Sequence, residues 1–503
     1  MPDPSQTYQT TQKFFSGTLW NHWAKMAQLG LGFIFTVIIT RKLGESLYGK
    51  YSLFISICFF VGLSTQFGFE NLINAYLPKL RRFPGRMAYL IRTLIQIRIG
   101  AGLIACAGFF AALEFFDHSG ANYDLGAPAV YIVCYAAFTS LASLLSRVLV
   151  AQYRLKHLSL VNFAAALVQT SLAYIFLAKG YGLSTVLAIV TGCALLSCAL
   201  CLILTRETIC VPAQRFDLKP LFHFGRASWC TAVVEFGLGK QIDILLIGYF
   251  VASVVQVGYY NLAVSTVVLL SSLMTAGLSG VALTAFSEIE MQQGKDRLGM
   301  AWCSLIKLEY ILCVPIIVFL MVYARPIIVN IYTQAYLPAA GLIQVYAGFL
   351  IGFRLFGGGV HLTGLYALGQ AKAVLLTRCA GGSVNLALDL MLIPKYGAMG
   401  AVLATGACQM TTVILEYLLI RRVIAHAFPV RFIMKVNLGI AAALAILNFF
   451  PVNTTLDLLW AALAYGISVL YALYHLKPLD GEVQNIISKL NNSTLTKFAS
   501  FYG

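Results

Sequence analysis

The segment Ser228–Phe250, SWCTAVVEFGLGKQIDILLIGYF, decides how the rest of the chain is interpreted. It is mostly apolar and 23 residues long, about the length that an α-helix needs to cross a bilayer. It nevertheless carries Glu235, Lys240 and Asp243. A charged side chain at the centre of a bilayer costs at least about 2.5–3.5 kcal/mol on insertion scales. We therefore expect this helix to face a protein interior or a water-filled cavity.

The composition predicts an all-α polytopic membrane protein. Of the 503 residues, 59% are hydrophobic and only 11% are charged, whereas soluble domains have about 25% charged residues. The 12 cysteines lie mostly in apolar runs without the spacing of metal ligands, so we expect neither a metal site nor a cofactor. The net charge of +16 is attributed to basic cytoplasmic loops rather than to nucleic-acid binding.

Fourteen apolar segments have the length of membrane spans, and they would form about 14 transmembrane helices. They are roughly 17–40, 51–75, 91–116, 127–150, 158–178, 184–205, 228–250, 256–282, 301–324, 338–361, 372–394, 398–420, 432–450 and 456–476. Lys and Arg gather in the loops 77–92, 206–227 and 421–435, on the same side as the N-terminus. Because basic loops stay in the cytoplasm, both termini are expected there.

The remaining connections favour a transporter over an enzyme. The loops on the opposite side are short and leave no room for the large outer domain that membrane glycosyltransferases and polymerases use. No GxxxxGK[ST] motif is present, so the chain is not expected to hydrolyse ATP itself.

The chain contains an internal repeat. Gly49–Tyr51 recurs in altered form as Gly258–Tyr260, 209 residues later, and Tyr181–Gly182 recurs as Tyr396–Gly397, 215 residues later. The turn sequences AQYRLKHLS and ALGQAKAVL are related at a similar offset. This pattern predicts two six-helix lobes in a pseudo-two-fold arrangement around a central cavity, a known transporter architecture. The expected parts are an N-terminal lobe 1–205, a connector 206–227, a C-terminal lobe 228–420, two extra helices 421–476 and a cytoplasmic tail 477–503.

Three segments carry a resemblance to a known family: ITRKLGESLYGKYSLFISICFFVGLSTQFGFENLINAYLPKL, KQIDILLIGYFVASVVQVGYYNLAVS and LIPKYGAMGAVLAT. They resemble polysaccharide-biosynthesis flippases (O-antigen or exopolysaccharide repeat-unit flippases) of the multidrug/oligosaccharidyl-lipid/polysaccharide exporter superfamily. The resemblance implies a central cavity lined mainly by helices 1, 2, 7 and 8, and alternating access. It also implies an isoprenoid-diphosphate-linked oligosaccharide as substrate, a bacterial inner membrane and neighbouring polysaccharide polymerase or assembly machinery.

A diphosphate-linked substrate needs cations in the cavity, and basic residues within spans are the first candidates. These are Lys25, Lys240 and Arg354. Snorkelling to the headgroups is the alternative for Lys25, and it is also the interpretation of Arg98 and Arg378, since all three lie near the expected cytoplasmic side. For Lys240 the alternative is a structural pair with the nearby Asp243.

The sugars need polar partners, and His22 and Asn261 are the candidates. His22 lies one helical turn before Lys25, on a similar helix face. Asn261 lies near the outward end of the eighth span, beside tyrosines that are alternatively interfacial anchors.

The acidic residues raise the question of ion coupling. Glu70, Glu235 and Asp243 fall in the spans that the resemblance places around the cavity. Partial desolvation favours the protonated form of a carboxylate, so these groups are candidates to exchange a proton or a sodium ion during transport. Static countercharges for the lysines are the alternative. Glu309 and Glu416, nearer the cytoplasmic ends, are expected at the surface.

Two glycine-rich places are candidate helix breaks. Gly237 and Gly239 precede Lys240, and Gly357–Gly359 interrupts the tenth span. We expect the seventh helix to bend at the first place during switching, although close packing explains these glycines equally well.

Two other transporter functions stay open. An ion-coupled multidrug antiporter of the same superfamily favours an acidic cavity, whereas the central spans here carry at least as many cations as acids. A peptidoglycan-precursor flippase also fits 14 spans, but its cavity is expected to hold several arginines, and the first span has only Lys25.

Overall fold

The computed structural model describes residues 4–118, 126–152, 154–237, 239–275, 278–424, 427–447, 452 and 454–476. Within these ranges all regular secondary structure is helical, as the composition predicts. The chain divides into two compact units, Met1–Gly258 and Tyr259–Gly503. The expected tail 477–503 lies outside the described residues.

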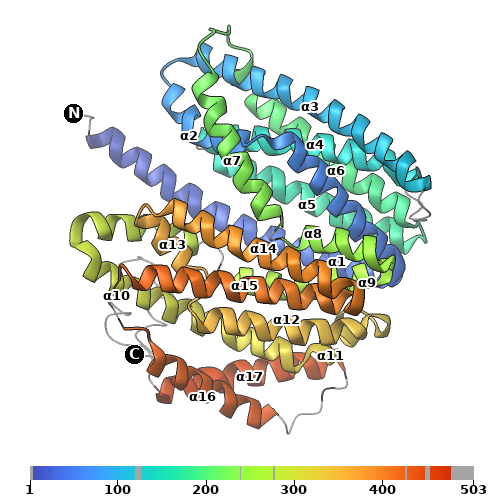
Figure 1. Cartoon of the computed structure of the whole chain (residues 1–503), viewed down its shortest axis with the longest axis vertical. Coiled ribbons are helices and arrows are strands. Elements are labelled where there is room, and N and C mark those ends of the chain that lie inside the picture. The colour runs from blue at the N-terminus through green and yellow to red at the C-terminus, as the bar shows by residue number, and fades with distance from the viewer. Residues whose placement is uncertain are drawn as a thin grey trace. The chain divides into compact units, whose positions relative to one another are not determined.

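The first unit is a bundle of long helices in which α3, α4, α5 and α6 lie side by side (Figure 1). Its helices are α1 (Pro4–Gln66), α2 (Phe69–Tyr76), η1 (Leu77–Leu80), α3 (Pro84–His118), α4 (Gly126–Ala151), α5 (Leu155–Ala178), α6 (Leu183–Ile209), α7 (Lys219–Gly237) and α8 (Lys240–Val251). The segment Ser228–Phe250 therefore packs with this unit, as the end of α7 and most of α8. The predicted lobe boundaries rest on the sequence repeat and stay a prediction.

The second unit is built on the helix pairs α14–α15 and α16–α17, with α10 and α12 packed against each other. Its helices are α9 (Val254–Thr275, which begins in the last residues of the first unit), α10 (Leu278–Val322), α11 (Ala324–Ile327), η2 (Ile328–Tyr332), η3 (Gln334–Tyr336), α12 (Pro338–Leu355), α13 (Val360–Ala367), α14 (Ala371–Tyr396), α15 (Ala398–Arg421), α16 (Val430–Leu447) and α17 (Thr455–Leu476).

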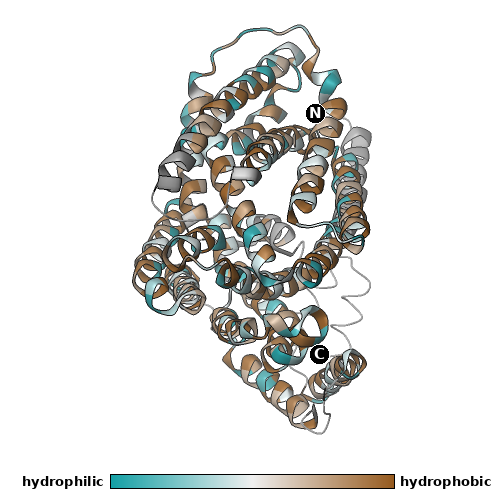
Figure 2. Cartoon of the chain, turned by 90° about the vertical axis from the view of Figure 1, so that its right-hand side faces the viewer, coloured by the Kyte–Doolittle hydropathy of each residue, from teal (hydrophilic) through white to brown (hydrophobic). Residues whose placement is uncertain are grey.

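The outer surfaces of the helices are those of a multi-pass membrane protein. Within the described residues, 11 helices are long and apolar enough to cross a membrane. Figure 2 shows hydrophobic residues along most turns of the helices. Large apolar side chains are exposed, among them Leu103 (69%), Ile104 (74%) and Leu376 (70%). Such surfaces are stable against lipid rather than water.

Each of the 14 predicted spans overlaps a helix, but the number of spans stays a prediction. The first two predicted spans share the continuous helix α1, which is bent at Gly44 (φ 78°, ψ 177°). The seventh is divided between α7 and α8, because the backbone at Gly239 is extended (φ −96°, ψ 154°). The helix is therefore broken at the place that the glycines indicate, whereas its bending during switching stays a prediction.

Two turns in different units have the same backbone conformation, which supports the internal repeat. Arg154 precedes α5 with φ −86° and ψ 40°, and Gln370 precedes α14 with φ −88° and ψ 43°. The Arg154 N–H donates to the carbonyl of Leu149 at 2.9 Å, and the Gln370 N–H donates to the carbonyl of Leu365 at 2.9 Å. The two turns are the sequences that the repeat aligns.

The repeated glycines Gly49 and Gly258 allow two backbones to touch. A Cβ atom on Gly49 would lie 1.7 Å from the carbonyl oxygen of Val254, and one on Gly258 would lie 2.9 Å from that of Glu45. Both positions therefore require glycine, since small residues permit this close approach of membrane helices.

Candidate functional site

A charged network in the first unit is centred on Glu70. The positive φ angles of Phe67 (43°) and Gly68 (69°) end α1 and start the short helix α2. Glu70 lies in the first turn of α2, where the helix dipole stabilises a negative charge. Arg147 Nε of α4 donates to Glu70 Oε2 at 3.1 Å, and Arg98 Nη2 of α3 lies 3.7 Å from Glu70 Oε1.

Arg98 is buried and joins α3 to α4. Only 3% of the residue is exposed, so its interpretation as a snorkelling side chain is wrong. Its Nε donates to Ser140 Oγ at 2.7 Å, and its Nη2 donates to Ser143 Oγ at 3.1 Å. Ser140 Oγ also shares a hydrogen bond of 2.9 Å with Thr65 of α1. These bonds replace part of the hydration that burial removes from the guanidinium.

This network carries more positive than negative charge. Arg98 and Arg147 share the single carboxylate of Glu70, and the Arg147 side chain is 45% exposed. An excess cation that solvent reaches is a group that can meet an anionic ligand. Glu70 itself acts here as a countercharge, whereas its predicted ion exchange stays a prediction.

The break between α7 and α8 positions Lys240 and Asp243. Lys240 is the first residue of α8, and Asp243 follows in the same turn with no exposed surface. The helix is held on α1 because Ser56 Oγ donates to Gln241 Oε1 at 2.6 Å. On the α7 side, Trp229 Nε1 donates to the carbonyl of Leu63 at 3.0 Å. A lysine thus stands at a helix start within a predicted span.

The second unit contains a related network around Arg354. Arg354 of α12 is 9% exposed and forms a buried ion pair with Glu309 of α10. Its Nη2 also donates to Ser271 Oγ of α9 at 3.3 Å. In each repeat, arginine, glutamate and serine side chains therefore link the second, third and fourth predicted spans. The arginine lies on the third span of the first repeat and on the fourth span of the second repeat, and the glutamate and serine positions differ likewise.

Two acids expected at the surface are buried, so that expectation is wrong. Glu309 is 6% exposed and Glu416 is 1% exposed. Their charges are matched by Arg354 and by Arg378, whose Nη2 lies 3.4 Å from Glu416 Oε1. Position along a helix predicts depth in the membrane, but it does not predict which face packs against a neighbour.

The predicted break at Gly357–Gly359 is present and lies beside Arg354. Gly357 (φ 96°) and Gly358 (φ 56°) separate α12 from α13. His361 in α13 has no exposed surface and accepts at Nδ1 a hydrogen bond of 3.1 Å from Trp302 Nε1. Its Nε2 is therefore the protonated nitrogen, which donates to the carbonyl of Phe356.

The remaining predicted site residues are Lys25, Asn261, His22 and Glu235. Lys25 is exposed on α1. Asn261 is half-buried on α9 and accepts a hydrogen bond of 3.2 Å from Ser265 Oγ. The side chains of His22 and Glu235 lie outside the described residues. In the part of the chain that the structure describes, no three metal-ligating side chains form a cluster.

Two polar residues were missed by the sequence analysis. No local sequence pattern marks Arg147 as a functional residue, because its partner Glu70 is 77 residues away in the sequence. Asp389, by contrast, is a lone acid in the middle of a predicted span, which is the pattern that singled out Asp243. It has no exposed surface, and its Oδ2 accepts from Asn385 Nδ2 at 2.7 Å.

The family is shown by a match over more than half of the chain. The model of the family described as "Polysaccharide biosynthesis protein" matches residues 38–341, and that of "Lipid II flippase MurJ" matches residues 226–471. The chain belongs to the polysaccharide biosynthesis protein family, within the superfamily of multidrug, oligosaccharidyl-lipid and polysaccharide exporters. It is a flippase-like transporter rather than an enzyme.

Individual known proteins share only a low sequence identity with this chain. An uncharacterized membrane protein of Methanocaldococcus jannaschii is 25% identical over 281 residues, and the match spans 54% of each chain, about half of that relative. A structure of the lipid II flippase MurJ in an inward closed conformation has a TM-score of 0.73 at 17% identity, and covers 94% of this chain and 100% of its own.

Two further solved structures share the fold. An inward-facing multidrug resistance transporter of the MATE family has a TM-score of 0.67 at 12% identity, covering 78% of this chain and 94% of its own. A superfamily transporter from Pyrococcus furiosus, described as having a binding pocket of reverse polarity, has a TM-score of 0.55 at 11% identity, covering 82% and 95%. At these identities the likeness concerns the fold alone.

Proposed function

We propose that this protein is a flippase that moves a lipid-diphosphate-linked oligosaccharide repeat unit from the cytoplasmic to the outer leaflet of a bacterial inner membrane. Transport proceeds by alternating access, and both termini lie in the cytoplasm. The family match over residues 38–341 supports the transporter class. The excess of basic residues in the cytoplasmic loops supports the orientation.

The observation that carries the proposal is the broken helix at Lys240. Transporters commonly build substrate sites from discontinuous helices whose N-termini attract anionic groups. Here α8 starts at Lys240 inside a predicted span, so the lysine ammonium and the first backbone N–H groups of α8 lie together at one helix end, with Asp243 in the same turn. In this proposal that helix end binds the diphosphate or an acidic sugar.

Further residues complete the proposed site. Arg147 adds a half-exposed cation whose only described carboxylate partner is shared with Arg98. Lys25 and Arg354 are the other proposed phosphate contacts, and His22 and Asn261 are the proposed sugar contacts. The ion pair with Glu309 means that Arg354 must exchange partners to act in this way.

Coupling to an ion gradient is a separate part of the proposal. Asp243 has no exposed surface and lies in the first turn of α8, three residues after Lys240. Asp243, together with Glu70 and Glu235, would take up and release a proton or sodium ion as the cavity alternates. Delivery to a polysaccharide polymerase or related assembly machinery would remove the product.

A second candidate is a peptidoglycan-precursor flippase. The MurJ family model matches residues 226–471, and the MurJ fold covers 94% of this chain. Arg98 and Arg147 also add arginines beside the second span. The multidrug antiporter has no comparable support, because each acid of the two described networks is matched by at least one arginine.

Complementation separates these candidates. We expect the wild-type chain to restore surface polysaccharide in bacteria that lack their own repeat-unit flippase, and not to support growth of cells depleted of their peptidoglycan-precursor flippase. The opposite pattern would replace the first candidate with the second. The Lys240→Ala variant should restore little polysaccharide, whereas the exposed Lys372→Ala control should act like wild type, with membrane levels of both variants measured in parallel.

A further inference from the structure

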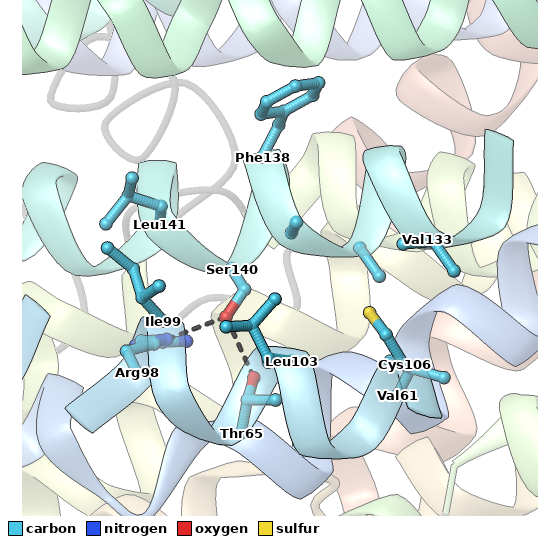
Figure 3. Close-up of a pocket in the computed structure, with 13 residues that line it drawn as sticks. Val61, Thr65, Arg98, Ile99, Leu103, Cys106, Val133, Phe138, Ser140 and Leu141 are labelled. Carbon is cyan, nitrogen blue, oxygen red and sulfur yellow. Dashed lines mark hydrogen bonds between the residues drawn. The ribbon is translucent and has the colours of Figure 1, made fainter. Parts of the chain in front are cut away.

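A pocket of about 250 Å³ lies in the first unit between α1, α3 and α4. Its lining is mostly apolar (Figure 3). Val61 and Thr65 come from α1, Leu103 and Cys106 from α3, and Phe138 from α4. None of the residues that we assign to transport, such as Lys240, lines it. The pocket therefore needs an explanation of its own.

One end of the pocket is cationic. Arg98 lines it there, and Cys106 lies toward the other end (Figure 3). The Nε and Nη2 groups of Arg98 are bonded to Ser140 and Ser143. Within the described residues, the buried Nη1 group has no hydrogen-bond partner. A buried charged donor without an acceptor is costly, so this nitrogen favours a ligand that supplies an acceptor.

The pocket opens on a surface that faces lipid. Ile99 (51% exposed) and Leu103 (69% exposed) belong to its lining, and the neighbouring Ile104 is 74% exposed. A contiguous apolar surface on a membrane helix is covered by hydrocarbon chains. A lipid of the surrounding bilayer can therefore enter sideways, without passing through the transport pathway.

The shape of the pocket fits one hydrocarbon chain. The lining residues Arg98, Gly102 and Cys106 follow one another along α3, and the segment from Arg98 to Cys106 spans about 12 Å at the helical rise. The volume is below the roughly 300–1,000 Å³ of typical small-molecule sites. It accommodates part of a chain with its polar end beside Arg98, rather than a whole lipid or a long polyprenyl chain.

The charges select an anionic head group. The ionic groups described near this end are Arg98, Glu70 and Arg147, and the two arginines share the single carboxylate. The remaining positive charge is complementary to a phosphate that carries no positive group of its own. From the orphaned guanidinium nitrogen, the lateral opening and this charge balance, we infer that the pocket binds an anionic phospholipid of the bilayer, with one acyl chain along α3 and its phosphate beside Arg98.

Native mass spectrometry of the purified full-length protein tests this inference. The protein would be titrated with phosphatidylglycerol, phosphatidylcholine or a polyprenyl phosphate. Gly102→Leu is the first variant, because a side chain at Gly102 has open space around it and would occupy the pocket while Arg98 stays intact. Arg98→Gln is the second variant. Arg154→Gln is the matched control, since it removes an arginine charge of the first unit that pairs with Glu207 and does not line the pocket.

We expect wild type to prefer phosphatidylglycerol over phosphatidylcholine by about tenfold, as a charged hydrogen bond would give. Gly102→Leu and Arg98→Gln should lose this preference, and Arg154→Gln should keep it. Equal binding of the two phospholipids would indicate that only water reaches Arg98 and would overturn the inference. Equal binding by Gly102→Leu and wild type would also overturn it, even if Arg98→Gln fails to fold. Preference for the polyprenyl phosphate would instead assign the pocket to the lipid carrier.

Discussion

The guanidinium of Arg354 and the carboxylate of Glu309 form an ion pair that is buried between α12 and α10. In the first unit, Arg98 stands in a similar relation to Glu70, although at a longer distance of 3.7 Å. Two arginines that the sequence suggests for other roles, substrate binding and snorkelling, thus hold helices together in this structure.

Removing one partner of the Arg354–Glu309 pair should be strongly destabilising. Arg354→Met leaves a buried carboxylate, and Glu309→Gln leaves a buried guanidinium, at a cost of about 3–5 kcal/mol each. The double variant should recover part of this loss. Thermal unfolding of the purified protein measures these effects. The control is Glu207→Gln, which breaks the exposed pair with Arg154 and should cost at most about 1 kcal/mol. Equal effects at Glu309 and Glu207 would contradict the buried pairing.

The helix break at Gly357–Gly359, beside the Arg354–Glu309 pair, should tolerate an added methyl group at Gly359 but not at Gly357. Gly357 has φ +96°, and a Cβ atom there would lie 2.6 Å from the His361 ring. Gly357→Ala should therefore lower stability by more than the roughly 1–2 kcal/mol of left-handed backbone strain. Gly359 has φ −70° and open space around it, so Gly359→Ala is the control and should be close to neutral. Thermal unfolding of both variants decides the point, and identical curves would refute the required conformation.

Asp243→Asn tests whether transport is coupled to an ion gradient. Asparagine resembles the protonated acid, so the variant should retain some flipping in vesicles but lose its dependence on an imposed proton or sodium gradient. The exposed Glu207→Gln change should leave that dependence intact. If gradients have no effect on the wild-type protein, or act equally on Asp243→Asn, the carboxylates are countercharges only.

The sequence predicts the helical fold and the helix breaks well, because both depend on local signals. The lengths of the apolar segments locate the helices, and closely spaced glycines locate the ends of α7 and α12. Lys240 and Asp243 stand out because they interrupt an apolar segment. The matched turns at Arg154 and Gln370 likewise follow from a repeat that is visible in the sequence.

Charge pairing between distant helices could not be predicted in the same way. Glu70 meets Arg147 only because α2 packs against α4. Glu309 and Glu416 are expected at the surface from their positions along their helices, but these positions do not specify which helix face packs against a neighbour. The pocket beside Arg98 is a property of three packed helices, and no single segment carries a signal for it.

Flipping in reconstituted vesicles tests the proposed transport activity and the role of Lys240 together. The wild-type protein should move a fluorescent polyprenyl-diphosphate oligosaccharide between leaflets, and Lys240→Ala should slow this movement by about tenfold or more, as expected when a charged contact to phosphate is lost. The exposed Lys372→Ala control should match wild type. If Lys240→Ala flips the lipid as fast as wild type, Lys240 does not bind the substrate. If wild type transports drug cations and leaves the oligosaccharide lipid in place, the protein is not a flippase for this lipid.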